Sequence, residues 1–147
     1  MEPKRRLPVL KTASPEEEEA ANRPPWQWIG FGAVGIFAAW LPLAYVAGLA
    51  AARIGLEGGA RPVAVGVMAA SLAVASMAGG FLVGRWGAHG VGVREAALAG
   101  LAAALIAAGL SLGAPGALVG AAVCVIVAVP FAAIGGRLGL RRREPTL

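Results

Sequence analysis

Apolar and polar residues follow one another in long blocks along this chain of 147 residues. Four apolar stretches, at about 26–52, 62–84, 95–113 and 115–136, are separated by short segments that carry charges, glycines or prolines. Each stretch is close to the ~20 residues that a helix needs to cross the ~30 Å core of a bilayer. The pattern therefore predicts an all-α integral membrane protein with four transmembrane helices.

The polar segments at the two ends define the domain organisation. Residues 1–25 carry five prolines, a basic cluster and an acidic run, but little apolar surface, so we expect a disordered, charged cytoplasmic tail. Residues 26–140 form the predicted transmembrane domain, and residues 141–147 a basic cytoplasmic tail. The first apolar stretch begins too late for a signal peptide, so the first span is expected to stay in the protein.

The positive charges are distributed unevenly about the four spans. Four crossings place the N-terminus, the middle loop and the C-terminus on one side, which holds eleven of the thirteen Lys and Arg residues; Arg53 and Arg61 fall on the other. The positive-inside rule predicts both termini in the cytoplasm. The abundance of Ala, Gly and Arg suggests a bacterial inner membrane. Residues expected to anchor the inner interface are Trp26, Trp28, Arg85, Trp86, Arg94, Arg137 and Arg141.

The two predicted hairpins resemble each other at an offset of 52 residues. Residues 47–87 and 99–139 share about 13 identities in 41 aligned positions, and Arg85 aligns with Arg137. Because both halves begin on the inner side, the hairpins are predicted to be parallel repeats, related by an axis along the membrane normal. Such an arrangement predicts a four-helix bundle.

Small residues recur every fourth position in the predicted helices. In a bilayer, helices associate through close backbone approach, which small residues permit, because lipid provides no hydrophobic drive between them. The stripes predict small-xxx-small packing within the bundle or in a homo-oligomer. The residues predicted to pack are Ala44, Gly48, Ala52, Ser76, Gly80, Gly84, Gly100, Gly116, Gly120, Cys124, Ala128, Ala132 and Gly136.

Residues that support chemistry are scarce in the spans. No Asp, Glu, Lys, His or Arg lies in the middle of any span, although ion-coupled transporters usually place an ionisable residue there. His89, the single histidine, has no neighbouring metal ligands in sequence, and one cysteine, Cys124, allows no intramolecular disulfide. We therefore expect no enzyme activity, no cofactor and no metal. The positive charges form no continuous basic helix, so nucleic acid is not an expected partner.

The glycine-rich helix ends carry a resemblance to a known family. Three motifs next to the predicted turns carry it: Gly79-Gly80-Phe-Leu-Val-Gly84-Arg85, Glu95-Ala-Ala-Leu-Ala-Gly100 and Gly135-Gly136-Arg137-Leu-Gly139. Over roughly residues 28–143, the chain resembles the YrzE-type small bacterial membrane proteins, which have four helices and no established activity. The resemblance implies a fold and a membrane location, but no site residues. The charged tail at 1–25 is longer than is usual in that family.

These observations leave three hypotheses about function. The first is a non-enzymatic inner-membrane protein that acts by helix packing, with itself or with a larger membrane complex. The second is a small transport or permeation unit, acting as a single chain or as a dimer, that uses the predicted helix kinks at Pro42 and Pro130. The third is a membrane anchor that presents residues 1–25 to a cytoplasmic partner. The lipid bilayer is an expected partner in all three.

Overall fold

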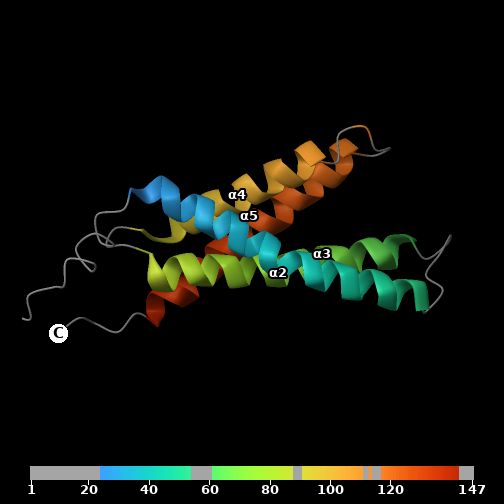
Figure 1. Ribbon diagram of the computed structural model, residues 1–147, viewed down its shortest axis with the longest axis horizontal. Coiled ribbons are helices and arrows are strands. Elements are labelled where there is room, and N and C mark those ends of the chain that lie inside the picture. The colour runs from blue at the N-terminus through green and yellow to red at the C-terminus, as the bar shows by residue number, and fades with distance from the viewer. Residues whose placement is uncertain (1–23, 54–60, 88–90, 111–112, 114–116, 143–147) are drawn as a thin grey trace, which may run out of the picture.

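The computed structural model describes residues 24–53, 61–87, 91–110, 113 and 117–142. These residues form four α-helices (Figure 1): α2 (Pro25–Arg53), α3 (Arg61–Trp86), α4 (Val93–Leu110) and α5 (Ala117–Arg141). Each helix is long and apolar enough to cross a membrane, and the described part of the chain contains no strand. Most of the two predicted tails, the loop at 54–60, His89 and Gly116 lie outside the described residues.

The helix bounds agree with the sequence prediction except at the ends of the second hairpin. Helix α4 ends at Leu110, three residues before the predicted end at 113, and α5 continues to Arg141, five residues beyond the predicted end at 136. The pair Gly135-Gly136 suggested a helix end, but both glycines lie inside α5 and are buried. The helix continues there because neighbouring helices, rather than solvent, surround its glycine backbone.

The first turn of α4 shows why this helix begins where it does. The backbone N–H of Gly92 donates a hydrogen bond to Oε2 of Glu95 at 2.6 Å, and the N–H of Ala96 donates to the Gly92 carbonyl at 3.2 Å. A Glu that reaches back to the residue preceding the helix satisfies a donor that the helix itself leaves without a partner. Its negative charge also lies at the positive end of the helix dipole.

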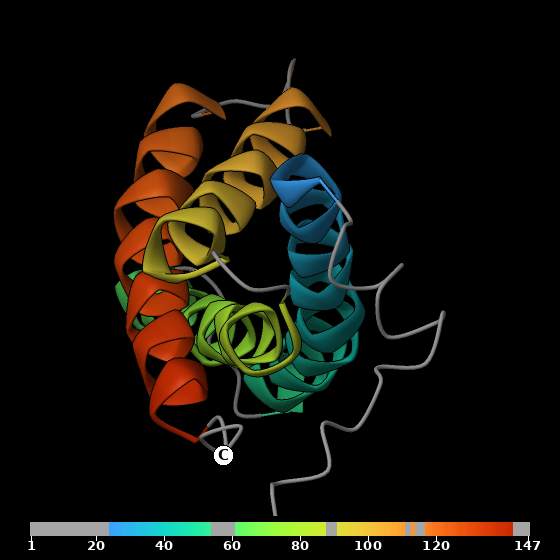
Figure 2. The ribbon, with the colours of Figure 1, turned by 90° about the vertical axis from the view of Figure 1, so that its left-hand side faces the viewer.

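The four helices surround a common centre in the order α2, α3, α5, α4 (Figure 2), and the most extensive interface joins α3 to α5. One pair of contacts differs from what the two-fold axis expected from the repeat would give. Such an axis would make the α3–α4 and α2–α5 contacts equivalent, but α3 touches α4 while the described parts of α2 and α5 do not touch. The two hairpins lie side by side, so that α2 packs against α4 as well as against α3.

The core consists of three small clusters of buried side chains. One cluster contains Val83, Val91 and Ala96, with Trp28 packed against it. A second cluster contains Ala33, Ile36, Ala103 and Ala132, and a third contains Leu72, Ala104 and Ala128. Most of these side chains are alanines, which indicates that close approach of the helix backbones, rather than large side chains, fills the centre.

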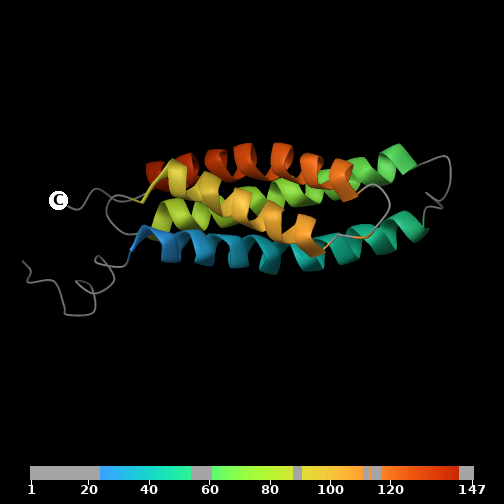
Figure 3. The same ribbon diagram turned by 90° about the horizontal axis from the view of Figure 1, so that it is seen from above.

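The bundle is closed at one end and open at the other. The start of α2, the end of α3, the start of α4 and the end of α5 gather at the left of Figures 1 and 3. Toward the other end the two hairpins diverge, and α2 and α3 extend beyond the tips of α4 and α5 (Figures 1 and 3). For α2 and α4 the difference follows from the residue counts, 29 and 18, whereas α3 and α5 are nearly equal in length, with 26 and 25 residues. We call these the closed half and the open half of the bundle.

Candidate functional site

The closed half is held by glycines at the crossing of α3 and α5. A Cβ added at Gly80 would overlap the backbone of Ala132, and one added at Gly84 would overlap the backbone of Gly136. The contacts are reciprocal, because Cβ atoms added to α5 at Gly135 and Gly139 would overlap the backbone of α3. The backbones of α3 and α5 are therefore in direct contact over more than two helical turns. Only glycine permits this close approach at the contact positions, because a Cβ would overlap the facing backbone.

The other predicted packing residues of the closed half lie along the same seam. Ser76, Ala128 and Ala132 have no exposed surface. A Cβ on Gly100 of α4 would meet the Ala128 carbonyl oxygen at 2.7 Å, so α4 and α5 also approach closely. The structure thus brings Ser76, Gly80, Gly84, Gly100, Ala128, Ala132 and Gly136 together around α5.

Several close contacts of the closed half were not predicted from the sequence. Gly32 of α2 is buried where an added Cβ would meet Ala99 of α4 and Val83 of α3, both at 2.6 Å. Gly79 packs on Ile36, and Gly139 packs on α3 as described above. Gly135 and Gly139 are four residues apart, as are Ala132 and Gly136. A search for every four-residue stripe of small residues on α5 would therefore have predicted the contact of Gly135 and Gly139 with α3.

The predicted packing residues of the open half have different surroundings. Ala52 and Gly120 are exposed, and a Cβ added at Gly120 would have nothing within 4 Å. Ala44, Gly48 and Cys124 are half-buried, and a Cβ at Gly48 would make only an ordinary contact, 3.8 Å from Cε of Met68. Gly116 lies outside the described residues. Within one chain, Gly120 faces open space because the hairpins have diverged at its level.

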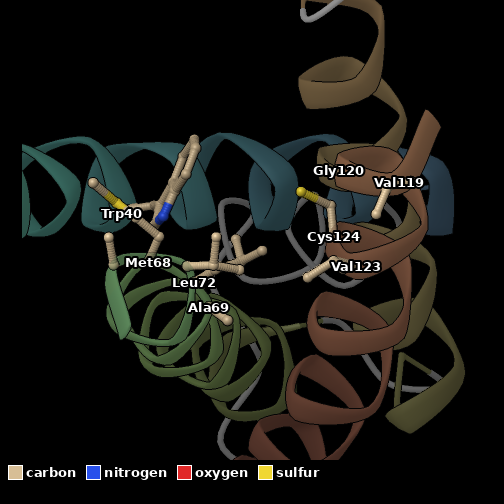
Figure 4. Close-up of a pocket in the computed structure, with 10 residues that line it drawn as sticks. Trp40, Met68, Ala69, Leu72, Val119, Gly120, Val123 and Cys124 are labelled. Carbon is tan, nitrogen blue, oxygen red and sulfur yellow. The ribbon is translucent and has the colours of Figure 1, made fainter. Parts of the chain in front are cut away.

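The divergence leaves an apolar cleft of about 640 Å³ between the hairpins. One wall comes from α2 and α3, with Trp40, Met68 and Leu72, and the opposite wall comes from α5 (Figure 4). The α5 wall consists of Val119, Gly120, Val123 and Cys124. The volume of the cleft lies within the ~300–1,000 Å³ of ordinary ligand pockets. No ionisable side chain other than Cys124 lines it.

Three buried polar atoms of the described residues, in the side chains of Trp28, Trp40 and Ser76, have no hydrogen-bond partner. The indole Nε1 of Trp40, at the edge of the cleft, has none, and neither has the Oγ of Ser76 in the α3–α5 seam. Among the residues that the structure describes, no three His, Cys, Asp or Glu side chains are close enough together to hold a metal ion. The cleft therefore offers an apolar surface, and the indole N–H of Trp40 is buried at its edge.

The predicted interface anchors are all at the closed end, and all of them except Trp28 are exposed. Trp26 and Trp86 are 68% and 64% exposed, and Arg94, Arg137 and Arg141 are exposed as well. Arg85 Nη1 donates to the carbonyl oxygen of Arg142 at 3.2 Å. Trp28 differs, because its indole packs inward on the Val83 cluster and its Nε1 is buried without a partner. Only a Trp at the bundle surface can place its N–H among headgroups.

These features define the class of the protein as an all-helical, multi-pass membrane protein with four candidate spans. Compared with protein-family models, with curated proteins and with solved structures, the chain matches none. Its function must accordingly be argued from its own residues.

Proposed function

We propose that this chain is a non-enzymatic protein of the bacterial inner membrane that acts by helix association, with a second copy of itself or with a larger membrane complex. The observation that carries the proposal is the contrast between the two halves of the bundle. The closed half is sealed by backbone contacts such as that of Gly80 with Ala132, whereas the open half keeps an apolar cleft of about 640 Å³.

The lining of the cleft fits a transmembrane helix. Its walls include small residues from both hairpins: Ala64 and Ala69 from α3, and Gly120 from α5. Small residues let a partner backbone approach closely, and this approach is the main source of helix association in lipid. A helix seated in the cleft would contact both hairpins at once and thereby fix the angle between them.

The proposal includes an orientation and a location. Five exposed arginines, Arg85, Arg94, Arg137, Arg141 and Arg142, belong to the closed end, whereas the exposed Arg53 ends α2 at the open end. Under the positive-inside rule this end faces the cytoplasm, with both termini inside. Membership of the YrzE-type proteins, two homologous hairpins and a bacterial inner membrane are parts of the same proposal, and the sequence patterns support them.

A leucine substitution inside the cleft tests the proposal. Gly120→Leu places an apolar side chain in the cleft, and its Cβ has no neighbouring atom within 4 Å. Gly30→Leu is the matched control, since Gly30 is also exposed with nothing within 4 Å but lies on α2, outside the cleft. After purification from native membranes in a mild detergent, Gly120→Leu should lose the homo-oligomer or a defined partner, and Gly30→Leu should keep it. A monomer without partners in the unsubstituted protein would contradict the proposal.

The two other hypotheses have less support. An aqueous transport path needs polar or ionisable lining, and the cleft has an apolar one. Measurable ion flux through liposomes of the purified protein would nevertheless favour transport over association. The anchor hypothesis rests on residues 1–25, of which nearly all lie outside the described residues, and it predicts that deletion of the tail abolishes function.

A further inference from the structure

A second apolar hollow lies on the flank of the bundle, where α3 and α5 cross. It has a volume of about 370 Å³ and is open along one side. We call it the flank groove. Its lining residues are Val74, Met77, Ala78, Phe81 and Leu82 of α3 and Leu138 of α5. The α3 residues recur after three or four positions, at 74, at 77 and 78, and at 81 and 82, so they form one stripe along a single face of the helix. The groove therefore runs lengthwise toward the closed end.

The same stripe ends in a basic and aromatic pair. Arg85 lies four residues beyond Phe81, and Trp86 lies four beyond Leu82, so both continue the face that lines the flank groove. Both side chains are exposed. From α5, Arg141 and Arg142 follow Leu138 by one turn and are exposed as well. Each helix that forms the groove thus carries positive charge at the closed end of it.

The geometry of the crossing brings these charges together. Gly84 and Gly139 allow the ends of α3 and α5 to touch along their backbones. Arg85 Nη1 donates to the backbone oxygen of Arg142, which ties the two helix ends to each other. The one carboxylate side chain among the described residues, Glu95, accepts a hydrogen bond from the Gly92 N–H at the start of α4. The end of the groove is therefore strongly positive.

An apolar groove that ends at several arginines matches one kind of partner. A guanidinium forms forked, charge-assisted hydrogen bonds with phosphate oxygens, and Trp side chains favour the headgroup level of a bilayer. We propose that α3 and α5 form a site for an anionic phospholipid, with an acyl chain along the flank groove and the phosphate at Arg85 and Arg141. This site is separate from the cleft, and it requires membrane embedding but no partner helix.

Charge-matched variants test the site against diffuse attraction. The protein is reconstituted in vesicles of equal parts phosphatidylglycerol and phosphatidylcholine with identical chains, extracted in detergent, and analysed for retained lipid by native mass spectrometry. The unsubstituted protein should retain phosphatidylglycerol preferentially. Arg85→Gln with Arg141→Gln should lower this retention at least about tenfold, given ~1 kcal/mol for each basic residue at an anionic surface. Arg94→Gln with Arg53→Gln, which removes the same charge from α4 and from the last turn of α2, neither of which lines the flank groove, should lower it less than about threefold.

A third variant separates the groove from the arginines. Ala78 is exposed and lines the flank groove, so Ala78→Phe obstructs the acyl chain without changing any charge. It should reduce phosphatidylglycerol retention while Arg85 and Arg141 remain. Equal losses in the two double variants, retention unaffected by Ala78→Phe, or displacement of the lipid by soluble glycerol phosphate would each overturn the proposal.

Discussion

The substitution Gly80→Ala isolates the contact on which the closed half depends. The added Cβ would overlap the carbonyl oxygen of Ala132 and lie only 2.8 and 2.9 Å from its carbonyl carbon and Cα. These are backbone atoms of a helix and cannot rotate away, so α3 and α5 must separate along the seam. Overpacking of this kind costs ~1–3 kcal/mol, and a rigid neighbour places the cost at about 2–3 kcal/mol.

Gly30→Ala is the matched control for this prediction. Gly30 lies in α2 with nothing within 4 Å of an added Cβ, so the same methyl group meets no neighbour and should leave stability unchanged or raise it by up to ~1 kcal/mol. Reversible unfolding of the purified protein in mixed micelles, followed by circular dichroism as the denaturing detergent increases, measures both. If Gly80→Ala lies within about 0.5 kcal/mol of the unsubstituted protein, the reasoning about the seam is refuted.

Three further predictions concern topology, capping and the tail. Reporter fusions after residues 10, 57, 90 and 147 should read cytoplasmic, external, cytoplasmic and cytoplasmic, and any other order means that a span is wrongly assigned. Glu95→Ala should lower the free energy of unfolding by about 1 kcal/mol, and Glu95→Gln, which keeps an acceptor, by less than half as much; equal losses would argue against the cap. Deletion of residues 2–22 should leave the unfolding transition and the oligomeric state unchanged, whereas loss of association would favour the anchor hypothesis.

The helices themselves could be predicted from the sequence, because length and apolar composition alone decide whether a segment can cross a bilayer. The end of α5 could not be predicted in the same way. Gly135 and Gly136 read as a helix end when the neighbours are unknown, but in the bundle they are the surfaces on which α3 and α4 pack. In a sequence, a glycine is consistent both with a turn and with a close contact between helices, and only the tertiary arrangement distinguishes the two.

The small-residue stripes illustrate a second limit. Gly80 and Gly120 belong to similar stripes, but Gly80 lies in a backbone contact and Gly120 faces the cleft. A four-residue spacing identifies a face of a helix but not the depth at which two helices cross. The cleft could not be foreseen either, since it results from the divergence of the hairpins, and its lining residues, such as Trp40 and Val123, carry no motif.

Photo-crosslinking in native membranes tests the association account most directly. A photoreactive residue at Val119, which is 71% exposed on the α5 wall of the cleft, should react with a transmembrane partner and give a product of one defined mass. That mass would be twice the 14.7 kDa of the chain for a homodimer. The same residue at Val34, 67% exposed on α2 outside the cleft, should react with lipid alone. Combination with Gly120→Leu should abolish the Val119 product. Lipid adducts alone at Val119, or the same products at both positions, would contradict the account.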